Sequence, residues 1–314
     1  NNKNMKKTRK LKIAAIVSAA VIGILALTLA LGLVGFTSSS DYINLDLKKI
    51  RFEKSTLIVT DAHGKAIDRE SSGLVRLSEL NNDTKNAFLA VEDSRFYKHG
   101  GVDVKGVLRA LAKNISAGKF IEGGSTITQQ LIKNTHLSGE KTVRRKANEF
   151  LLACQLEKTL SKDEIFEAYL NTAYFGNNCY GIAAASGFYF GKSADKLTLS
   201  ESATLAGMLR SPNIYAPNKN IEKAKERRDI ALNCMLKNGF IDEAAAEKAR
   251  TQKLSVAEHS PNIYVKSAIL EACGILGVTE AQLSRGYKIE TYFDAETAKN
   301  LEKALRSDNS EYGF

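Results

Sequence analysis

The feature that most constrains this chain is a stretch of 24 residues without a charge, residues 13–36. A helix of that length measures roughly 36 Å, enough to cross a hydrocarbon core of about 30 Å with some tilt. Residues 1–12 carry six basic side chains and no acidic one, which predicts a cytoplasmic N-terminus and places the rest of the chain on the outer side. A cleaved signal peptide is the alternative, but its apolar region usually has about 7–15 residues, so an uncleaved signal anchor is favoured.

The remainder of the chain has only a mild positive bias. The formal net charge is +10, and subtracting the six basic residues at the N-terminus leaves +4. So small an excess argues against a nucleic-acid partner and suits an anionic membrane surface or a phosphorylated lipid. No pair of cysteines has C-x-x-C spacing, so we expect buried free thiols rather than a zinc site or disulfides at Cys154, Cys179, Cys234 and Cys273.

The apolar pattern predicts a mainly α-helical domain with a small β element. β-Branched residues at 55–61 indicate a strand, and a turn and a short return strand at 66–68 follow. Helical spacing then dominates from residue 78 to about residue 253. Residues 288–293 are strand-like again and precede a helical tail at 295–306. We expect residues 288–293 to pair with 57–60, because isolated strands leave backbone groups unpaired.

These patterns divide the chain into five segments. They are a cytoplasmic basic tail (1–12), a transmembrane anchor (13–36), a spacer (37–54), the helical domain (55–253), and a C-terminal strand and helix (254–314).

The first polar cluster in the helical domain is EDSRFYKHGG at residues 92–101. Glu92 and Asp93 end an apolar helix, where the helix dipole disfavours negative charge. Carboxylates kept at such a position are candidates for acid–base chemistry. The alternative is a solvated helix end with His99 in the turn.

The second cluster, GGSTITQQLIKN at residues 123–134, opens a helix with Ser125 or Thr126 as the N-cap. Free backbone N–H groups at a helix start can hold phosphate or sugar oxygens. Gln129, Gln130 and Lys133 follow within two turns, which packing alone does not require. The alternative is a capped surface helix.

The third cluster, RRKANE at residues 144–149, places Arg145 and Lys146 one turn before Glu149 on one helix face. Taken alone, this spacing is typical of a surface salt-bridge ladder.

Taken together, the motifs resemble the family 51 glycosyltransferases. That family includes the glycosyltransferase domains of class A penicillin-binding proteins and the monofunctional peptidoglycan glycosyltransferases. The three clusters stand in the family's order and are followed by KDEIFEAYLN at 162–171, YFGN at 174–177 and LAGMLRSPNIYAP at 205–217. The resemblance covers residues 54–250, and its departures are small: Lys141 stands where many relatives carry Arg, and Phe166 and Ala168 are less usual in the fourth motif.

The resemblance implies a lysozyme-like, mainly α fold that polymerises lipid II into β-1,4 glycan strands at the bacterial cell membrane. The anomeric carbon inverts and polyprenyl pyrophosphate is released. By the same resemblance Glu92 is the general base and Glu149 a second catalytic carboxylate that orients neighbouring cations. Substrate-binding or shaping roles carry over to Asp93, Phe96, His99, Gly101, Ser125, Thr126, Gln129, Gln130, Lys133, Arg145, Lys146 and Tyr174.

The expected partners are lipid II, the growing glycan strand and membrane lipid, with cell-wall synthesis proteins as further candidates. No residue pattern requires a cofactor or a metal ligand, and the need for a divalent cation stays open. The two competing functions are a lysozyme-like lytic wall enzyme and a catalytically silent cell-wall scaffold.

Two further patterns extend this interpretation. The apolar stripe Val104, Val107, Leu108 and Leu111 predicts either an amphipathic helix at the membrane surface or a helix facing the core. Residues 286–298 look like the linker strand that precedes a transpeptidase domain in class A relatives. We therefore expect either the front part of a bifunctional enzyme or a shortened protein.

Overall fold

The computed structural model describes residues 42–50, 58–68, 74–118, 123–137, 140, 142–177, 179–257, 263–278, 283, 287–294, 296–298 and 300. The predicted basic tail, the transmembrane anchor and most of the helical tail at 295–306 lie outside these ranges. Within them, none of the helices combines the length and the apolar character that a membrane crossing needs.

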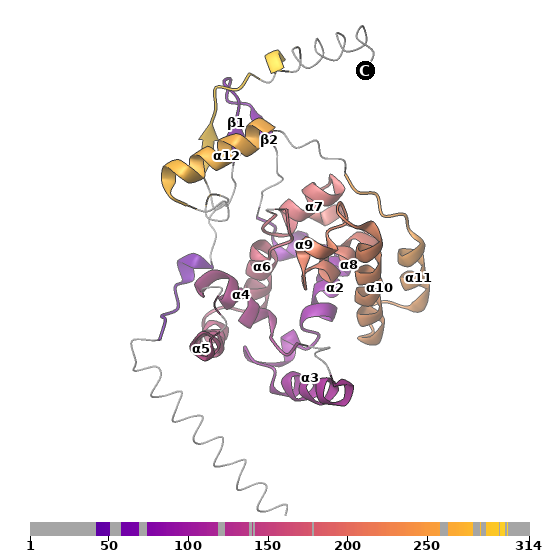
Figure 1. Cartoon of the computed structure of the whole chain (residues 1–314). Helices are drawn as coiled ribbons and strands as arrows, with labels where there is room; N and C mark the ends of the chain where they lie inside the picture. The colour runs from indigo at the N-terminus through magenta and orange to yellow at the C-terminus, as the bar shows by residue number, and fades with distance from the viewer. Residues whose placement is uncertain are drawn as a thin grey trace, which may run out of the picture.

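Helices make up most of the described chain, which confirms the prediction of a mainly α fold (Figure 1). They are α2 (Asn82–Glu92), α3 (Val104–Ala117), α4 (Ile127–His136), α5 (Val143–Thr159), α6 (Lys162–Thr172), α7 (Ile182–Phe190), α8 (Leu199–Met208), α9 (Pro212–Tyr215), α10 (Ile221–Lys237), α11 (Glu243–Thr251) and α12 (Ile263–Leu276). Four short 3-10 turns join them: η1 (Leu47–Lys49), η2 (Leu77–Glu79), η3 (Phe96–Lys98) and η4 (Ala194–Lys196).

Side-chain caps set where several of these helices begin. Asn81, Thr126, Ser161 and Thr198 each accept a hydrogen bond from a backbone N–H in the first turn of α2, α4, α6 and α8 respectively. The caps of α4, α6 and α8 are reciprocal, because a Gln or Glu in the first turn also accepts the N–H of the capping residue. These capping residues explain why separate helices begin at these positions within the region that the sequence predicts to be helical.

The core of the helical body is built around α8. Its residues from Ser200 to Met208 are all buried, and α2 and α10 pack against it. Phe88 of α2 meets the ring of Phe175 edge to face, with 5.9 Å between ring centroids. This packing fixes the end of α2, where Glu92 lies. The four cysteines are free thiols, as predicted, but Cys179 alone among them is buried and the other three are partly exposed.

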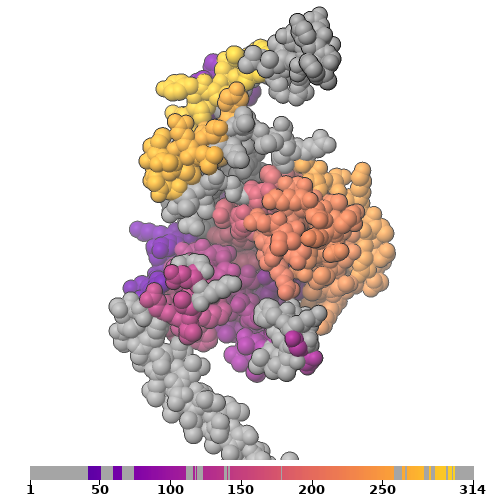
Figure 2. All heavy atoms as spheres, viewed as in Figure 1, coloured from indigo at the N-terminus to yellow at the C-terminus, as the bar shows by residue number. Residues whose placement is uncertain are grey.

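A small sheet lies at one end of the molecule and α3 at the opposite end (Figures 1 and 2). The strands β1 (Ile58–Thr60), β2 (Ala66–Asp68) and β3 (Lys288–Glu290) stand in the order β2-β1-β3. The β1–β2 pair is antiparallel, and the β1–β3 pair is parallel, with Val59 opposite Ile289. The predicted pairing of the C-terminal strand with the first strand is therefore confirmed.

Helix α12 covers the sheet through an apolar cluster formed by Val59, Val265 and Leu283. This helix is absent from the expectations above, which assigned residues 254–314 to a strand and a tail helix. Its apolar residues are spread around the helix rather than on one stripe, so helical periodicity does not reveal it.

Part of the predicted spacer packs on the helical body. The N–H of Ile43 donates to Asn148 Oδ1 over 2.9 Å, and the N–H of Asp46 donates to His136 Nε2 over 3.0 Å. Ile50 is 2% exposed and belongs to the main core. Residues 42–50 are therefore held against α4 and α5.

Candidate active site

Glu92 is the last residue of α2 and Asp93 caps its C-terminus, as the sequence predicts. Gln130 of α4 donates a hydrogen bond from Nε2 to Glu92 Oε2 over 2.7 Å. The surrounding protein raises the pKa of Glu92 by burial, and the hydrogen bond from Gln130 and the charge of Lys133 partly oppose that rise. A carboxylate with a raised pKa is a better proton acceptor when it is ionised.

Asp93 joins the turn after α2 to the start of α4. Its Oδ2 lies 2.9 Å from His99 Nε2 and accepts the N–H of Ile127 over 3.1 Å. Both side chains of the Asp93–His99 pair are 5% exposed. This buried link holds the α4 N-terminus beside the end of α2, so that Gln130, one turn along α4, reaches Glu92.

The start of α4 is closed by its own cap. Thr126 Oγ1 accepts the N–H of Gln129 and donates to the carbonyl of Gly101 over 2.6 Å. The side chain of Gln129 in turn accepts the N–H of Thr126. Asp93 binds the Ile127 N–H and Thr126 binds the Gln129 N–H, so these two groups at the helix start are not free for a phosphate.

Phe96 and Gly101 shape the site through internal contacts. Phe96 is 1% exposed and its ring packs edge to face against His99. Gly101 has φ +87°, and a Cβ there would lie 2.8 Å from the carbonyl oxygen of Ala153. Only glycine permits this approach of the turn to α5.

The cluster on α5 gathers two cations around a buried carboxylate. Glu149 is 2% exposed, accepts a hydrogen bond from Arg145 Nη1 over 3.1 Å and forms an ion pair with Lys146. Lys146 Nζ also lies 3.1 Å from Ser125 Oγ, which ties the cluster to the start of α4. The alternative of a surface salt-bridge ladder is wrong, because its carboxylate is inside the protein.

Tyr174 lies in a different set of contacts. Its hydroxyl donates to Asn213 Oδ1 of α9 over 3.4 Å, and its ring centroid lies 4.8 Å from that of Tyr180. No contact among the described residues joins Tyr174 to Glu92 or Glu149.

Two residues that the sequence analysis did not single out face Glu92. Tyr169 of α6 is buried, and burial together with the charges of Glu92 and Asp93 raises the pKa of its hydroxyl. Arg227 of α10 is half-buried and attracts the Glu92 carboxylate electrostatically. Tyr169 stands in the KDEIFEAYLN motif, and Arg227 stands in a charged run, KAKERRD at residues 223–229. Neither pattern points to Glu92, so only the packing of α6 and α10 reveals this association.

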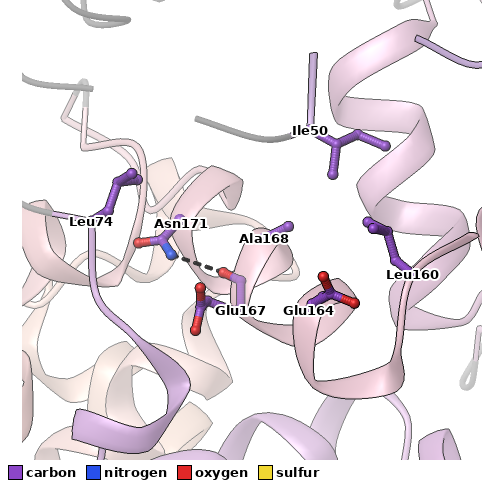
Figure 3. A pocket seen from close by; sticks show the side chains of 7 residues that line it. All are labelled: Ile50, Leu74, Leu160, Glu164, Glu167, Ala168 and Asn171. Carbon is purple, nitrogen blue, oxygen red and sulfur yellow. Dashed lines mark hydrogen bonds between the residues drawn. The ribbon is translucent and has the colours of Figure 1, made fainter. Parts of the chain in front are cut away.

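A separate pocket of about 200 Å³ lies on another face of α6 (Figure 3). It is lined by Ile50, Leu74, Leu160, Glu164, Glu167, Ala168 and Asn171. Glu167 accepts the N–H of Leu77, and Asn171 exchanges hydrogen bonds with the backbone of Val75. These polar side chains hold the segment at the start of η2 against α6, and Glu92 is not among the residues that line this pocket.

Comparison with known proteins assigns the chain to a family. Residues 60–236 match the family model described as Transglycosylase. The chain is 40% identical over 296 residues to penicillin-binding protein 1F of Bacillus subtilis, covering 90% of this chain and 41% of that protein. It is 37% identical over 244 residues to penicillin-binding protein 1A of Escherichia coli, covering 76% of this chain and 28% of that protein.

A crystal structure of penicillin-binding protein 1A from Haemophilus influenzae is similar with a TM-score of 0.43 and 23% identity, over 73% of this chain and 25% of that chain. The chain belongs to the transglycosylase family. Its matching region is similar to the glycosyltransferase domain of class A penicillin-binding proteins. It spans less than half the length of the curated relatives named here.

Proposed function

We propose that this chain is a peptidoglycan glycosyltransferase with a lysozyme-like catalytic domain. It joins the anomeric carbon of a glycan held as a polyprenyl pyrophosphate to the 4-hydroxyl of an incoming lipid-linked disaccharide. The observation that carries the proposal is the Glu92 carboxylate, oriented by Gln130 next to Lys133 and enclosed enough for burial to raise its pKa.

In this proposal Glu92 accepts the proton of the attacking 4-hydroxyl. As that proton moves to the carboxylate, the hydroxyl oxygen bonds to the anomeric carbon and the bond from that carbon to the pyrophosphate oxygen breaks. Attack from the side opposite the leaving group inverts the anomeric centre, with the sugar hydroxyl taking the place that water has in inverting glycosidases. A sugar hydroxyl is a poor nucleophile without such a base.

The leaving pyrophosphate is already acidic, so it needs positive charge more than a proton. Lys133 on α4 and the pair Arg145 and Lys146 on α5 supply that charge. Glu149 fixes the two α5 side chains through ion pairs, which keeps them oriented before substrate arrives. Donors held in place in this way cost little reorganisation during the reaction.

The membrane side of the domain is α3 in this proposal. Val104, Val107 and Leu108 are exposed, at 65%, 42% and 60%, so the alternative of a core-facing stripe is wrong for these three residues. Lys105 and Arg109 lie on the same helix. An apolar face flanked by basic residues suits the headgroup layer, where a polyprenyl tail would leave the bilayer.

The lytic and scaffold alternatives predict different products. A lytic enzyme would cleave finished glycan and would not need the cations around Glu149, and a silent scaffold would not need an oriented carboxylate at residue 92. Purified full chain should be incubated with labelled lipid II and the products separated on a gel. Polymer that disappears in Glu92→Gln supports the proposal, whereas release of wall fragments without polymer would favour the lytic enzyme.

A further inference from the structure

Arg227 on α10 is held in place at two points. Its Nε donates to the carbonyl of Gly207 on α8 over 2.9 Å. Its guanidinium carbon lies 5.3 Å from the centroid of the Tyr215 ring on α9. A guanidinium bound to a backbone carbonyl and packed on an aromatic ring has lost most of the freedom of a surface arginine.

The contact between α8 and α10 is close at this point for a steric reason. A Cβ on Gly207 would lie 2.5 Å from the carbonyl oxygen of Arg227. The two helices can approach this closely only because residue 207 has no side chain. The position of Arg227 is thus set by the packing of the helical body rather than by a local rotamer preference.

Arg227 acts on Glu92 from a different helix than Gln130 and Lys133 do. α10 packs against α2 as well as α8, and the charges of Arg227 and Glu92 attract each other. The charged and titratable groups facing Glu92 are Asp93 after α2, Lys133 on α4, Tyr169 on α6 and Arg227 on α10. The carboxylate therefore has one cation from α4 and one from α10.

The ends of the Arg227 guanidinium are not used to hold the fold. In the part of the chain that the structure describes, Nη1 and Nη2 of Arg227 have no hydrogen-bond partner, and only Nε is bonded. The next residue shows the contrast. Arg228 is 3% exposed and donates to the backbone carbonyls of Arg250 and Gln252, which is the arrangement of a structural arginine.

We infer that Arg227 is a positioning residue that acts through Glu92: its fixed positive charge on α10 keeps this carboxylate ionised. The inference rests on the proposed function, in which Glu92 must be ionised to accept a proton. Removing a nearby positive charge makes the ionised form less favourable, so the fraction of active base at a given pH falls.

The test compares Arg227→Gln and Arg227→Lys with a matched control, Lys225→Gln, which removes a charge from the exposed side of the same helix where Lys225 pairs with Glu222. The full chain is assayed with labelled lipid II over a range of pH. In Arg227→Gln we expect kcat to fall on the order of 10-fold, part of the general-base contribution, with KM little changed. We also expect the acidic limb of kcat/KM to move to higher pH. Arg227→Lys should restore the limb partly, and Lys225→Gln should match wild type.

A direct titration separates this inference from the proposed function. Chain labelled with ¹³C at the glutamate carboxyl carbons, with Glu92→Gln to assign the signal, reports the Glu92 pKa by NMR whether or not polymer is made. A higher Glu92 pKa in Arg227→Gln than in wild type supports the inference. An unchanged pKa and an unchanged acidic limb would overturn it, while absence of polymer from the wild-type chain would overturn only the proposed function.

Discussion

Gln130 Nε2 and Glu92 Oε2 lie 2.7 Å apart, joining the second turn of α4 to the last residue of α2. The hydrogen bond exists because Asp93 holds the start of α4 through the Ile127 N–H. Asp93 therefore fixes the start of α4, and α4 carries the Gln130 side chain that orients Glu92. In the proposed function, Glu92 is the reactive member of this adjacent pair and Asp93 is the structural one.

Replacing Glu92 with Gln should remove activity without unfolding the chain. The amide keeps the shape of the side chain and still accepts the hydrogen bond from Gln130, but it cannot take a proton. We expect polymerisation of lipid II to fall by roughly 10²–10⁴-fold, the usual contribution of a general base. Gel analysis at equal folded fraction measures this, with the exposed Glu247→Gln as the control. Activity within threefold of wild type would exclude Glu92 as the base.

The same substitution should stabilise the fold near neutral pH. Burial raises the pKa of Glu92 in the folded chain above its value in the unfolded chain. The protonated side chain therefore contributes to the stability of the fold below the unfolded pKa, and this contribution is lost as pH rises through the folded pKa. Gln does not pay this cost of ionisation. Thermal unfolding should show a higher Tm for Glu92→Gln than for wild type at pH 7, with the gap closing toward pH 4. An equal gap at both pH values would contradict this assignment.

Glu149→Gln should both destabilise the domain and weaken catalysis. The change leaves the charge of Arg145 inside the protein without its carboxylate partner, and such a loss costs about 1–3 kcal/mol for a partly screened pair. Chemical denaturation measures the free energy of unfolding. Glu222→Gln is the control, because the exposed Glu222–Lys225 pair should change it by less than about 0.5 kcal/mol.

His136 should make the attachment of residues 42–50 sensitive to acid. Thr135 Oγ1 donates to the carbonyl of Leu131, so it accepts from His136 Nδ1, and Nε2 is left to accept the N–H of Asp46. Burial, and then the charge of Lys49, lower the pKa of His136. A lowered pKa means that the stability is present above the unfolded value of about 6.5 and is lost as pH falls through the folded pKa.

The test of this pH dependence is His136→Gln, whose amide oxygen can accept the same N–H at any pH. Tm measured from pH 7 down to pH 5 should fall less steeply for His136→Gln than for wild type. Parallel curves would show that His136 does not titrate in this contact.

The exposed face of α3 can be tested by fluorescence, because the chain contains no tryptophan. Leu108→Trp places a single reporter on the proposed membrane face, and Tyr287→Trp places one beside β3 at the other end of the molecule. In vesicles with brominated acyl chains, emission from residue 108 should shift to the blue and be quenched. Equal quenching at both positions would argue against a membrane-facing α3.

Local signals allowed much of this architecture to be predicted from the sequence. Thr126, predicted with Ser125 as a candidate N-cap, is a capping residue whose partner Gln129 lies three positions along the chain, so a window of four residues is enough to recognise it. The pairing of β1 with β3 followed from counting backbone groups that would otherwise lack partners. Arg145, Lys146 and Glu149 also lie within two turns of one helix, which made their association predictable.

The features that could not be predicted from the sequence depend on contacts between segments that are far apart in the chain. The charge of Arg227 acts on Glu92 only because α10 packs on α2 and α8. The residues around Arg227 in the sequence do not indicate this interaction. The family resemblance implies a site role for Phe96, and only the fold shows that its ring is buried beside His99. The helix start of α4 looks open in sequence because the carboxylate that closes it, Asp93, lies 34 positions earlier.

The parallel pairing of β1 with β3 also determines how the molecule would respond to tension. Pulling on the chain before Ile58 and beyond Glu290 loads the two strands in shear. The force acts on the N-terminal end of β1 and on the C-terminal end of β3, which lie at opposite ends of the parallel pair. The bonds of that ladder, together with those from Thr291 N to Thr60 O and from Ala62 N to Phe293 O, would carry the force. The segment between the strands, which includes α2, α4, α5 and α10, forms a loop that the force bypasses. Tension applied at these two points would therefore be carried by this short ladder, rather than by the helices around Glu92, until the ladder gave way.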